Sequence, residues 1–521
     1  MKIRNSSMLA LALSITIIVS MFGVFTAQVA ADDTIFVPNP TGIPETDWYN
    51  IQATLDAAMP GDTVQFAAGS YYIHRPLVKE GFSGTLKGVG QDLTKIIASK
   101  STYGDLFQAL EIDAWAGWEE FMVPAGCLFI TPTLAYFSDC TDSVSISDLS
   151  LVMDEEDITE YSYIADEVTG EIVFLIGEEF GYNMGYAFIL DIAAGCDTTL
   201  ERVSFVGAND GTYFQPISPN HGFYVTGRYL SSDDDGGTHT ALDCDFAGMG
   251  GNAYQLNGLS NAEVTVESCY FGYCHTGPAI YGCDRTNFVV RYNLFEHMNG
   301  WGAAYFGTSG GTGDISHNTM IDSGGLGVFA EAINPITHIP HENSYVSFDH
   351  NDVTLRQYGF FSAVEVYSTI DDSVRADLSI KGNKIHSEGA FPYGPIFTVN
   401  AHHAVISNNI ITGSGPAAMY IGIDDWEDWI FPSDHDVMIL GNNLQGWTVD
   451  GGPYAPYWEG MAYIWLSEYT SNCMVVGNTQ GTVADFGQDN FLVGSTPVAG
   501  VVPGDIISDA MNMKSTIWRF L

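Results

Sequence analysis

Seven short segments in the second half of the chain share one pattern, in which two alternating β-type apolar residues are followed by an asparagine. Successive asparagines are 25 to 36 residues apart, so a constant core is joined by loops of variable length. Such a repeat is typical of a solenoid in which each repeat forms one coil of short parallel strands. The asparagines are Asn293, Asn318, Asn351, Asn383, Asn409, Asn442 and Asn478.

The asparagines are predicted to stack at one turn of the coil and to hydrogen-bond along the stack, which satisfies a polar turn inside an apolar cylinder. Asp245 and Cys269 are predicted to hold the same position in earlier coils, with Val203 and Leu149 before them. A leucine-rich repeat would need denser leucines. An αβ solenoid would need a helical period between the strands, and no such period fits.

The stretch "TDWYNIQATLDAA" predicts a short amphipathic helix near the N-terminus. Ile51, Leu55 and Ala58 share one helical face, with Thr46 or Asp47 as the N-cap. This helix would cover the open end of the cylinder and protect its edge. Residues 504–521 are expected to cover the other end.

The segment "IQATLDAAMPGDTVQFAAGSYYI", followed by "LKGVG" and the asparagine-containing coils, resembles the pectin-lyase-like superfamily. The resemblance covers most of residues 45–495 and implies an all-β fold: a right-handed, single-stranded parallel β-helix with an N-terminal capping helix. The expected β-helix domain spans residues 32–495, with residues 496–521 as a C-terminal tail or cap. The superfamily contains lyases, hydrolases, epimerases and non-enzymatic surface proteins, so the fold alone implies no reaction.

The catalytic motifs of two families in this superfamily are not reproduced. "SFDHN" at 347–351 matches the "WIDH"-like segment of pectate lyases only in Asp349 and His350. "NHG" at 220–222 and several "DD" pairs resemble parts of the polygalacturonase set but do not occur in its order. Neither mechanism can therefore be carried over residue by residue.

Residues 1–31 are interpreted as a secretory signal peptide: Lys2 and Arg4 precede an apolar run, and small residues precede Asp32. A retained membrane anchor is the alternative; after cleavage no membrane span is expected. The location is predicted to be secreted, extracellular or in the cell envelope, where disulfides among the eight cysteines are permitted. A formal net charge of −46 disfavours nucleic acid as a partner.

A second repeated strand follows each turn, with the pattern Gly-x-small-apolar-x-apolar-x. Alternation directs one set of its side chains into the cylinder and the other set outward. The outward set combines aromatic rings, which stack on sugars, with amides and carboxylates, which bond hydroxyl groups. The predicted substrate-binding residues on this face are Tyr281, Phe306, Phe329, Tyr367 and Asn400. Packing against overlying loops is the alternative use of such aromatic residues.

Glu331 and Glu365 are the candidate catalytic residues. The pattern places them on successive coils, two positions apart, with Cα atoms roughly 8 Å from each other. Carboxyl groups at such positions fit the ~5–10 Å separation of glycosidase acid and base or nucleophile. An ordinary pair of solvated glutamates is the alternative interpretation.

The loop containing "DDWEDWIFP" is expected to hang at the edge of this face, with Trp426 and Trp429 as further substrate contacts. Asp371, Asp372, Asp424 and Asp425 offer hard oxygen ligands for calcium, although no EF-hand spacing is present. No other cofactor is implied. The acidic insertion at 152–183 reads as a hairpin around Thr169-Gly170.

These observations favour a secreted β-helix protein that acts on or binds polysaccharide, as a glycoside hydrolase or polysaccharide lyase. The alternative is a non-catalytic cell-surface or envelope β-helix protein that presents a face for a cell-surface glycan or another partner. The sequence does not distinguish between the two.

Overall fold

The computed structural model describes most of the chain between residues 33 and 497. The described ranges are 33–98, 110–112, 127–153, 163–166, 168–169, 171–175, 185–209, 221–227, 233–306, 310–330, 343–355, 362–368, 376–388, 396–401, 403–422, 434–450, 463–479, 482–494 and 496–497. Within these ranges no helix is long and apolar enough to cross a membrane.

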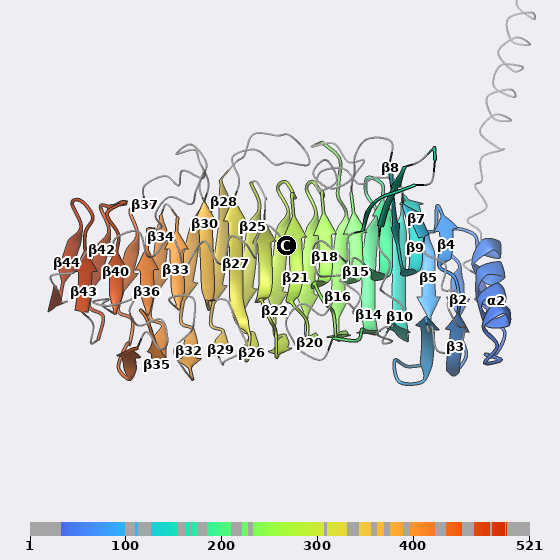
Figure 1. The fold of residues 1–521 in the computed structure, drawn as a ribbon, viewed down its shortest axis with the longest axis horizontal. Coiled ribbons are helices and arrows are strands. Elements are labelled where there is room, and N and C mark those ends of the chain that lie inside the picture. Colours follow the sequence, from blue (N-terminus) through green and yellow to red (C-terminus); the bar gives the residue numbers. More distant parts are fainter. Residues whose placement is uncertain are drawn as a thin grey trace, which may run out of the picture.

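The chain winds into stacked coils of parallel strands (Figure 1). A typical coil contains β19 Glu263–Glu267, β20 Tyr270–Gly272 and β21 Thr276–Tyr281. The first two strands join sheet A, which has 25 strands, and the third joins sheet B, which has 14. Each strand pairs in parallel with its counterpart one coil away, as β19 does with β22. The predicted right-handed, single-stranded parallel β-helix is confirmed.

Sheet A continues around a bend, so most coils contribute two strands to it. Its strands are β1 Thr34–Phe36, β2 Thr63–Gln65, β3 Gly69–Ile73, β5 Gly84–Lys87, β6 Thr94–Ala98, β10 Ser143–Val152, β14 Asp197–Val206, β16 Thr238–Leu242, β17 Asp245–Ala247, β19, β20, β22 Asn287–Arg291, β23 Leu294–Glu296, β25 Thr312–Ser316, β26 Thr319–Ile321, β28 Ser344–Asp349, β29 Asp352–Leu355, β31 Ala376–Lys381, β32 Lys384–Ser387, β34 Ala404–Ser407, β35 Ile410–Gly415, β38 Met438–Leu440, β39 Trp447–Val449, β42 Met474–Val476 and β44 Phe491–Val493.

Sheet B forms the remaining side of the cylinder. Its strands are β4 Leu77–Glu80, β9 Thr133–Cys140, β13 Tyr186–Ile192, β15 His221–Thr226, β18 Asn252–Asn257, β21, β24 Trp301–Phe306, β27 Gly324–Ala330, β30 Val364–Ser368, β33 Phe397–Asn400, β36 Met419–Ile421, β40 Ile464–Leu466, β43 Thr482–Asp485 and β45 Thr496–Pro497. The last of these begins just beyond the predicted domain boundary at residue 495.

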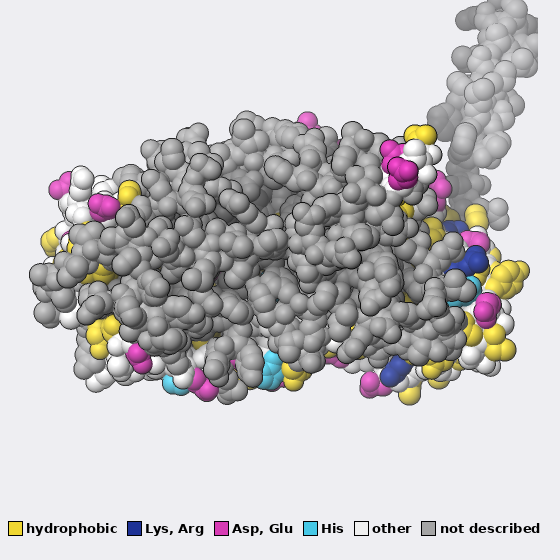
Figure 2. All heavy atoms as spheres, viewed as in Figure 1, with side chains coloured by type: hydrophobic (Ala, Val, Ile, Leu, Met, Phe, Trp, Pro, Cys, Tyr) yellow, Lys and Arg dark blue, Asp and Glu magenta, His cyan; other side chains and the backbone are white. Residues whose placement is uncertain are grey.

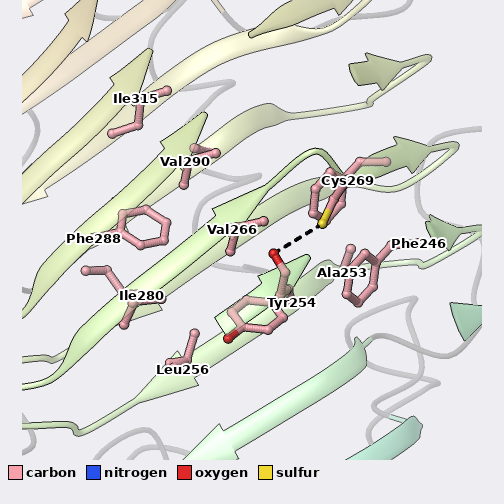
Figure 3. Close-up of a cluster of buried hydrophobic side chains, with 14 of the residues drawn as sticks. Phe246, Ala253, Tyr254, Leu256, Val266, Cys269, Ile280, Phe288, Val290 and Ile315 are labelled. Carbon is pink, nitrogen blue, oxygen red and sulfur yellow. Dashed lines mark hydrogen bonds between the residues drawn. The ribbon is translucent and has the colours of Figure 1, made fainter. Parts of the chain in front are cut away.

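The core of the cylinder consists of inward side chains from both sheets, which meet along the whole axis. In Figure 3, Phe246, Val266 and Phe288 from sheet A surround Tyr254 and Leu256 from sheet B. Phe246 stacks on Phe271 of the next coil with ring centroids 4.9 Å apart. Each coil therefore buries its apolar face only against its neighbours, which is why the fold requires many repeats.

The asparagines form the predicted ladder. Asn351 illustrates it: its Oδ1 accepts hydrogen bonds from the backbone N–H of Asn318 (3.0 Å) and from Asn318 Nδ2 (3.1 Å), while its own Nδ2 donates to the Ile315 carbonyl (2.9 Å). The same bonds recur from Asn293 to Asn478. The ladder thus provides hydrogen-bond partners for the backbone N–H and C=O groups of a buried turn, which water cannot reach.

One predicted member of this column is wrong. Tyr270 pairs with Asp245 and Leu294 pairs with Tyr270, so the column preceding Cys269 contains Cys244 and not Asp245. The register does place Leu149 opposite Val203, as expected. The one-residue error arose because the early coils have no asparagine to fix the alignment.

Cysteine replaces asparagine at the N-terminal end of the ladder. The backbone N–H of Cys269 donates a hydrogen bond to Asn293 Oδ1 (2.8 Å). The Cys269 thiol lies 3.5 Å from the Ala241 carbonyl, to which the Nδ2 of an asparagine at this position would donate. The seven cysteines whose side chains are described are buried. Burial raises the pKa of Cys274 to about 12, so this thiol is protonated and unreactive at neutral pH.

The N-terminal helix is present as α2, Pro44–Ala57, and lies across the first coils (Figure 1). Ile51 and Leu55 are fully buried against the core, as predicted. The predicted N-cap is wrong, because the helix begins at Pro44, whose fixed φ suits a first helical position. The Asp47 carboxylate instead accepts hydrogen bonds from the backbone N–H groups of Thr41 (2.7 Å) and Tyr72 (3.2 Å), which fastens the helix to β3.

A small antiparallel sheet interrupts the early coils. It contains β7 Leu110–Ile112, β8 Cys127–Thr131, β11 Tyr163–Asp166 and β12 Ile172–Leu175. β11 and β12 form the predicted hairpin, whose turn is held by Asp166 Oδ1 accepting from the Thr169 N–H at 2.7 Å. A two-stranded pair, β37 Asp434–His435 and β41 Thr470–Ser471, completes the described elements.

Candidate functional site on the outer face of sheet B

The outer face of sheet B contains two columns of side chains in strict register. One column runs through Asn257, Tyr281, Phe306, Phe329, Tyr367 and Asn400. The structure thus places all five strand residues of the predicted substrate-binding set on adjacent coils. For Phe329 and Tyr367 only the backbone lies within the described part of the chain.

The second column is Gln255, Ala279, Ala304, Gly327, Glu365, Thr398, Tyr420 and Trp465. These residues point away from the core, because their neighbours Leu256, Val366 and Val399 belong to the cylinder interior. Most of the outward side chains are nevertheless buried: Phe306 is 5% exposed and Asn400 1%. For Phe306 this burial agrees with the alternative given above, in which an outward aromatic side chain serves for packing.

The N-terminal part of the face holds a chain of amides. Asn252 Nδ2 donates to Gln255 Oε1 (2.8 Å), and Gln255 Nε2 donates to Asn257 Oδ1 (2.9 Å). Asn257 Nδ2 in turn donates to the Tyr224 hydroxyl. One polarised network therefore connects β15 and β18, in which each amide has a defined orientation.

Two buried titratable residues, His221 and Asp191, lie beside this network. His221 stacks on Tyr186 and its Nδ1 bonds the Asn252 carbonyl at 2.9 Å. Burial lowers the pKa of His221 to about 4, although the bond to Asn252 partly opposes this, so the imidazole is neutral at physiological pH. The Tyr136 hydroxyl donates to the Asp191 carboxylate, which is also buried.

The middle of the face is apolar. Trp301, Ala304 and Phe306 form a cluster that is separate from the cylinder core, with Tyr281 packed beside it. Trp301 and Phe306 meet edge-on with centroids 5.2 Å apart. Gly327 permits this arrangement, because a Cβ there would approach Trp301 Cδ2 to 2.7 Å. The indole of Trp301 therefore packs on Gly327, which lies directly opposite Glu365 on the neighbouring strand.

Glu365 is fully buried on this outer side, and its Oε1 accepts a hydrogen bond from the Ser362 hydroxyl at 3.2 Å. Ser362 Oγ also lies 3.5 Å from Thr398 Oγ1. The C-terminal part of the face is thus polar around one carboxylate. It ends at Tyr420 and Trp465, whose rings stack with centroids 6.3 Å apart.

The predicted spacing of the two glutamates is wrong. Gly327 lies opposite Glu365 and Phe329 lies opposite Tyr367, so position 331 is four residues along the chain from the partner of Glu365, and not two. The pattern alignment failed because the segment that contains Glu365, "FSAVEVY" at 361–367, lacks the initial glycine. Glu331 itself lies outside the described residues, as do Trp426, Trp429, Asp371, Asp372, Asp424 and Asp425.

Several members of the face were not predicted from the sequence, including Tyr136, Asp191, Tyr224, Asn252 and Trp301. Their strands were not all recognised as repeats, because the small antiparallel sheet of β7, β8, β11 and β12 interrupts the early coils. The segment "HGFYVT" at 221–226 carries the same strand pattern, and its alignment with "GNAYQLN" would have identified Tyr224.

Among the described residues, no group of three or more His, Cys, Asp or Glu side chains could hold a metal ion. The two described carboxylates on the outer face of β13 and β30, Asp191 and Glu365, are six strand steps apart. At ~4.8 Å a step this is roughly 29 Å, far beyond the separation of a glycosidase pair.

The parallel register and the stacked turns define this chain as a right-handed parallel β-helix, the fold that the resemblance to the pectin-lyase-like superfamily implies. No protein-family model matches the chain, and no curated protein matches its sequence.

Solved structures of similar shape were found. A family 28 exopolygalacturonase of Yersinia enterocolitica is 11% identical with a TM-score of 0.49, over 90% of this chain and 80% of that chain. The A-module of an Azotobacter vinelandii mannuronan C-5 epimerase is 14% identical with a TM-score of 0.38, over 84% and 95%. The DFA-IIIase of Arthrobacter chlorophenolicus A6 in complex with GF2 is 11% identical with a TM-score of 0.40, over 91% and 98%. At these identities the similarity concerns the fold.

Proposed function

We propose that this protein is carbohydrate-active and that a polysaccharide is recognised on the outer face of sheet B. The observation that carries the proposal is the register column Asn257–Tyr281–Phe306–Phe329–Tyr367–Asn400, which repeats amide and aromatic groups once per coil. A polymer that repeats along its own axis is the ligand whose geometry matches such a column. Aromatic rings bind the apolar faces of sugars, and amides bond their hydroxyl groups.

In the first form of the proposal, the protein cleaves the glycan by hydrolysis or elimination. Glu365 is then the candidate catalytic residue whose side chain the structure describes. Its partner carboxylate would be Glu331 or another acidic residue outside the described part of the chain. Calcium held by Asp371, Asp372, Asp424 and Asp425 would supply an electrophile or a bridge to an acidic sugar. Export from the cell would place the protein beside such a substrate.

The second form is a non-catalytic β-helix protein at the cell surface that presents this face to a glycan. One observation favours it: roughly 29 Å separates the strands of Asp191 and Glu365, so these two buried carboxylates cannot act together as an acid–base pair. Binding without turnover needs the column and no acid–base pair, and it requires ligand access to column members that are buried in this structure, such as Phe306 and Asn400.

The deciding experiment incubates the protein, with and without calcium, with neutral and acidic polysaccharides. New reducing ends and new unsaturated sugar ends are followed together, and binding is measured by affinity electrophoresis. Reducing ends alone would mean hydrolysis, unsaturated ends would mean a lyase, and retardation without products would mean the binding protein. Neither products nor retardation across a broad panel would overturn the proposal.

A further inference from the structure

Two exposed histidines lie on the turn that carries the asparagine ladder. Each ladder asparagine follows a residue in the left-handed conformation, and in two successive coils that residue is a histidine, His317 (φ 59°) and His350 (φ 60°). The two positions are equivalent, because Ser316 pairs with Asp349 on the neighbouring strand. One strand step of ~4.8 Å therefore separates the two backbones.

The imidazole rings of this histidine pair are in contact and face solvent. Their centroids are 5.2 Å apart and their planes are inclined by 79°. Both residues are exposed. Figure 2 shows histidine side chains at the surface along the edge of the molecule where β26 and β29 are labelled in Figure 1. An ion from solvent can therefore reach the pair.

The equivalent positions in the two flanking coils are Tyr292 and Gly382. The Tyr292 ring packs edge-on against His317 with centroids 5.4 Å apart, and the guanidinium carbon of Arg291 lies 5.9 Å from the Tyr292 ring. Gly382 supplies no side chain, and a Cβ there would come within 3.0 Å of His350 Nε2. The pair is thus held between an aromatic ring and a glycine, and neither neighbour supplies a third imidazole.

The ring nitrogens of the pair make no hydrogen bond within the described part of the chain. Other exposed histidines have a side-chain partner there: His297 Nδ1 lies 3.0 Å from Asp322 Oδ2, and His386 Nδ1 lies 3.0 Å from Thr412 Oγ1. The lone pairs of the histidine pair are therefore available to an external ligand.

Charged groups near the pair have both signs. The Asp349 carboxylate, next to His350 in the chain, is already engaged, because it accepts hydrogen bonds from Ser379 Oγ (3.1 Å) and the Lys381 backbone N–H (2.8 Å). The Lys381 and Arg291 side chains disfavour a cation, whereas the formal net charge of −46 favours one. The ligand set drawn from the described residues is therefore two imidazoles.

We propose that His317 and His350 bind a divalent transition-metal ion, with Cu²⁺ held more tightly than Ni²⁺ or Zn²⁺. Imidazole is a ligand that these three ions share, and Cu²⁺ forms the most stable complexes of the series. An ion about 2.0–2.1 Å from one nitrogen of each ring, at an angle of about 90–110°, holds the ring centroids roughly 4.5–5.2 Å apart.

The observed separation of 5.2 Å lies within this range. The rings meet edge to face, so one ring must rotate about χ2 to aim both nitrogens at the ion, and this torsion is soft in an exposed imidazole. Water fills the remaining positions on the metal.

The bound ion would connect two coils directly above Asn318 and Asn351 of the ladder. The two imidazoles come together only in the folded chain, so the ion should raise the melting temperature. This site is independent of the glycan proposed on sheet B.

Titration of the full-length protein with Cu²⁺ tests the proposal. Electron spin-echo spectra of the first bound equivalent should show two coordinated imidazoles, and the melting temperature should rise. His317→Asn and His350→Asn should each weaken Cu²⁺ binding by roughly tenfold or more, because even the loss of a partner outside the ligand set costs about that much. Asparagine is chosen because it tolerates the left-handed conformation.

The control is His386→Gln, at an exposed histidine of β32, which should bind Cu²⁺ as the wild-type protein does. Melting temperatures without metal show that each variant is folded. Undiminished affinity for the first equivalent in both His317→Asn and His350→Asn would place the ion elsewhere in the chain and overturn the proposal. A single coordinated imidazole in the wild-type protein would also overturn it.

Discussion

At the scale of single residues, buried histidines connect the stability of the fold to pH. His239 is fully buried, with Nδ1 2.9 Å from Thr198 Oγ1 and Nε2 2.7 Å from the Gly236 carbonyl. Burial lowers the pKa of His239 to about 4, and the pKa of the buried His275 is lowered to about 4 in the same way. Both rings are neutral in the folded protein at pH 7.

We therefore predict that the unfolding free energy falls as the pH decreases from about 6.5 to about 4. In this window the two histidines bind protons in the unfolded chain but not in the folded chain. The stabilisation is therefore present above pH 6.5 and is lost toward pH 4. Each histidine contributes on the order of 3 kcal/mol to this change. Urea unfolding at several pH values should show that the unfolding free energy of His239→Gln depends less steeply on pH than that of the wild-type protein. The matched control is His386→Gln, at an exposed position, and equal slopes in the two variants would contradict the prediction.

Glu365 offers the residue-scale test of catalysis. Its buried position next to Ser362 sets it apart from the surface glutamates. If the protein turns over glycan with this group as acid or base, Glu365→Gln should reduce the rate by roughly 10²–10⁴-fold, because the amide preserves shape but not proton transfer. Glu388→Gln, at an exposed position of sheet A, is the control. Unchanged turnover in Glu365→Gln, with an unchanged melting temperature, would remove Glu365 from the candidate site.

At the scale of structural elements, the asparagine ladder is the clearest stabilising unit. The Asn351 side chain makes four hydrogen bonds to neighbouring coils and the residue is 1% exposed, whereas Asn478 is the last member and is half-buried. The ladder joins coils whose loops differ in length, because its bonds involve only the constant turn.

We predict that Asn351→Ala lowers the unfolding free energy by about 3 kcal/mol or more, since it leaves a buried N–H, a buried amide and the Ile315 carbonyl without partners. Asn478→Ala should cost about 1 kcal/mol, because water can replace its bonds at the end of the ladder. Denaturant unfolding measures both variants. Equal losses at the two positions would show that the ladder does not act through burial.

At the scale of the whole molecule, charge dominates. A formal net charge of −46 over one elongated cylinder produces self-repulsion that salt screens. We predict that the melting temperature rises by a few degrees between low and high sodium chloride. Millimolar calcium should raise it further than sodium chloride of matched ionic strength if the acidic loops bind the ion. No difference between the two salts would argue against the calcium site.

What the sequence determined by itself is the coil. The asparagine spacing and the strand alternation identified the fold, the ladder and the inward residues, because both depend on contacts that recur once per repeat. The N-cap of α2 and the position of Asp245 were predicted incorrectly. The start of the helix at Pro44 and the register of an interrupted early coil are set by local structure, which the repeat does not reveal.

Only the tertiary structure decided which outward residues share a column and which are buried. A two-residue change of register moved Glu365 from opposite Phe329 to opposite Gly327, and no pattern in a single strand fixes that offset. Burial of Phe306, Asn400 and Glu365 on the outer face, and exposure of Phe491 and Met438 on the other sheet, are also invisible to alternation. Alternation determines on which side of a strand a residue lies, whereas solvent access depends on everything else that packs against that side.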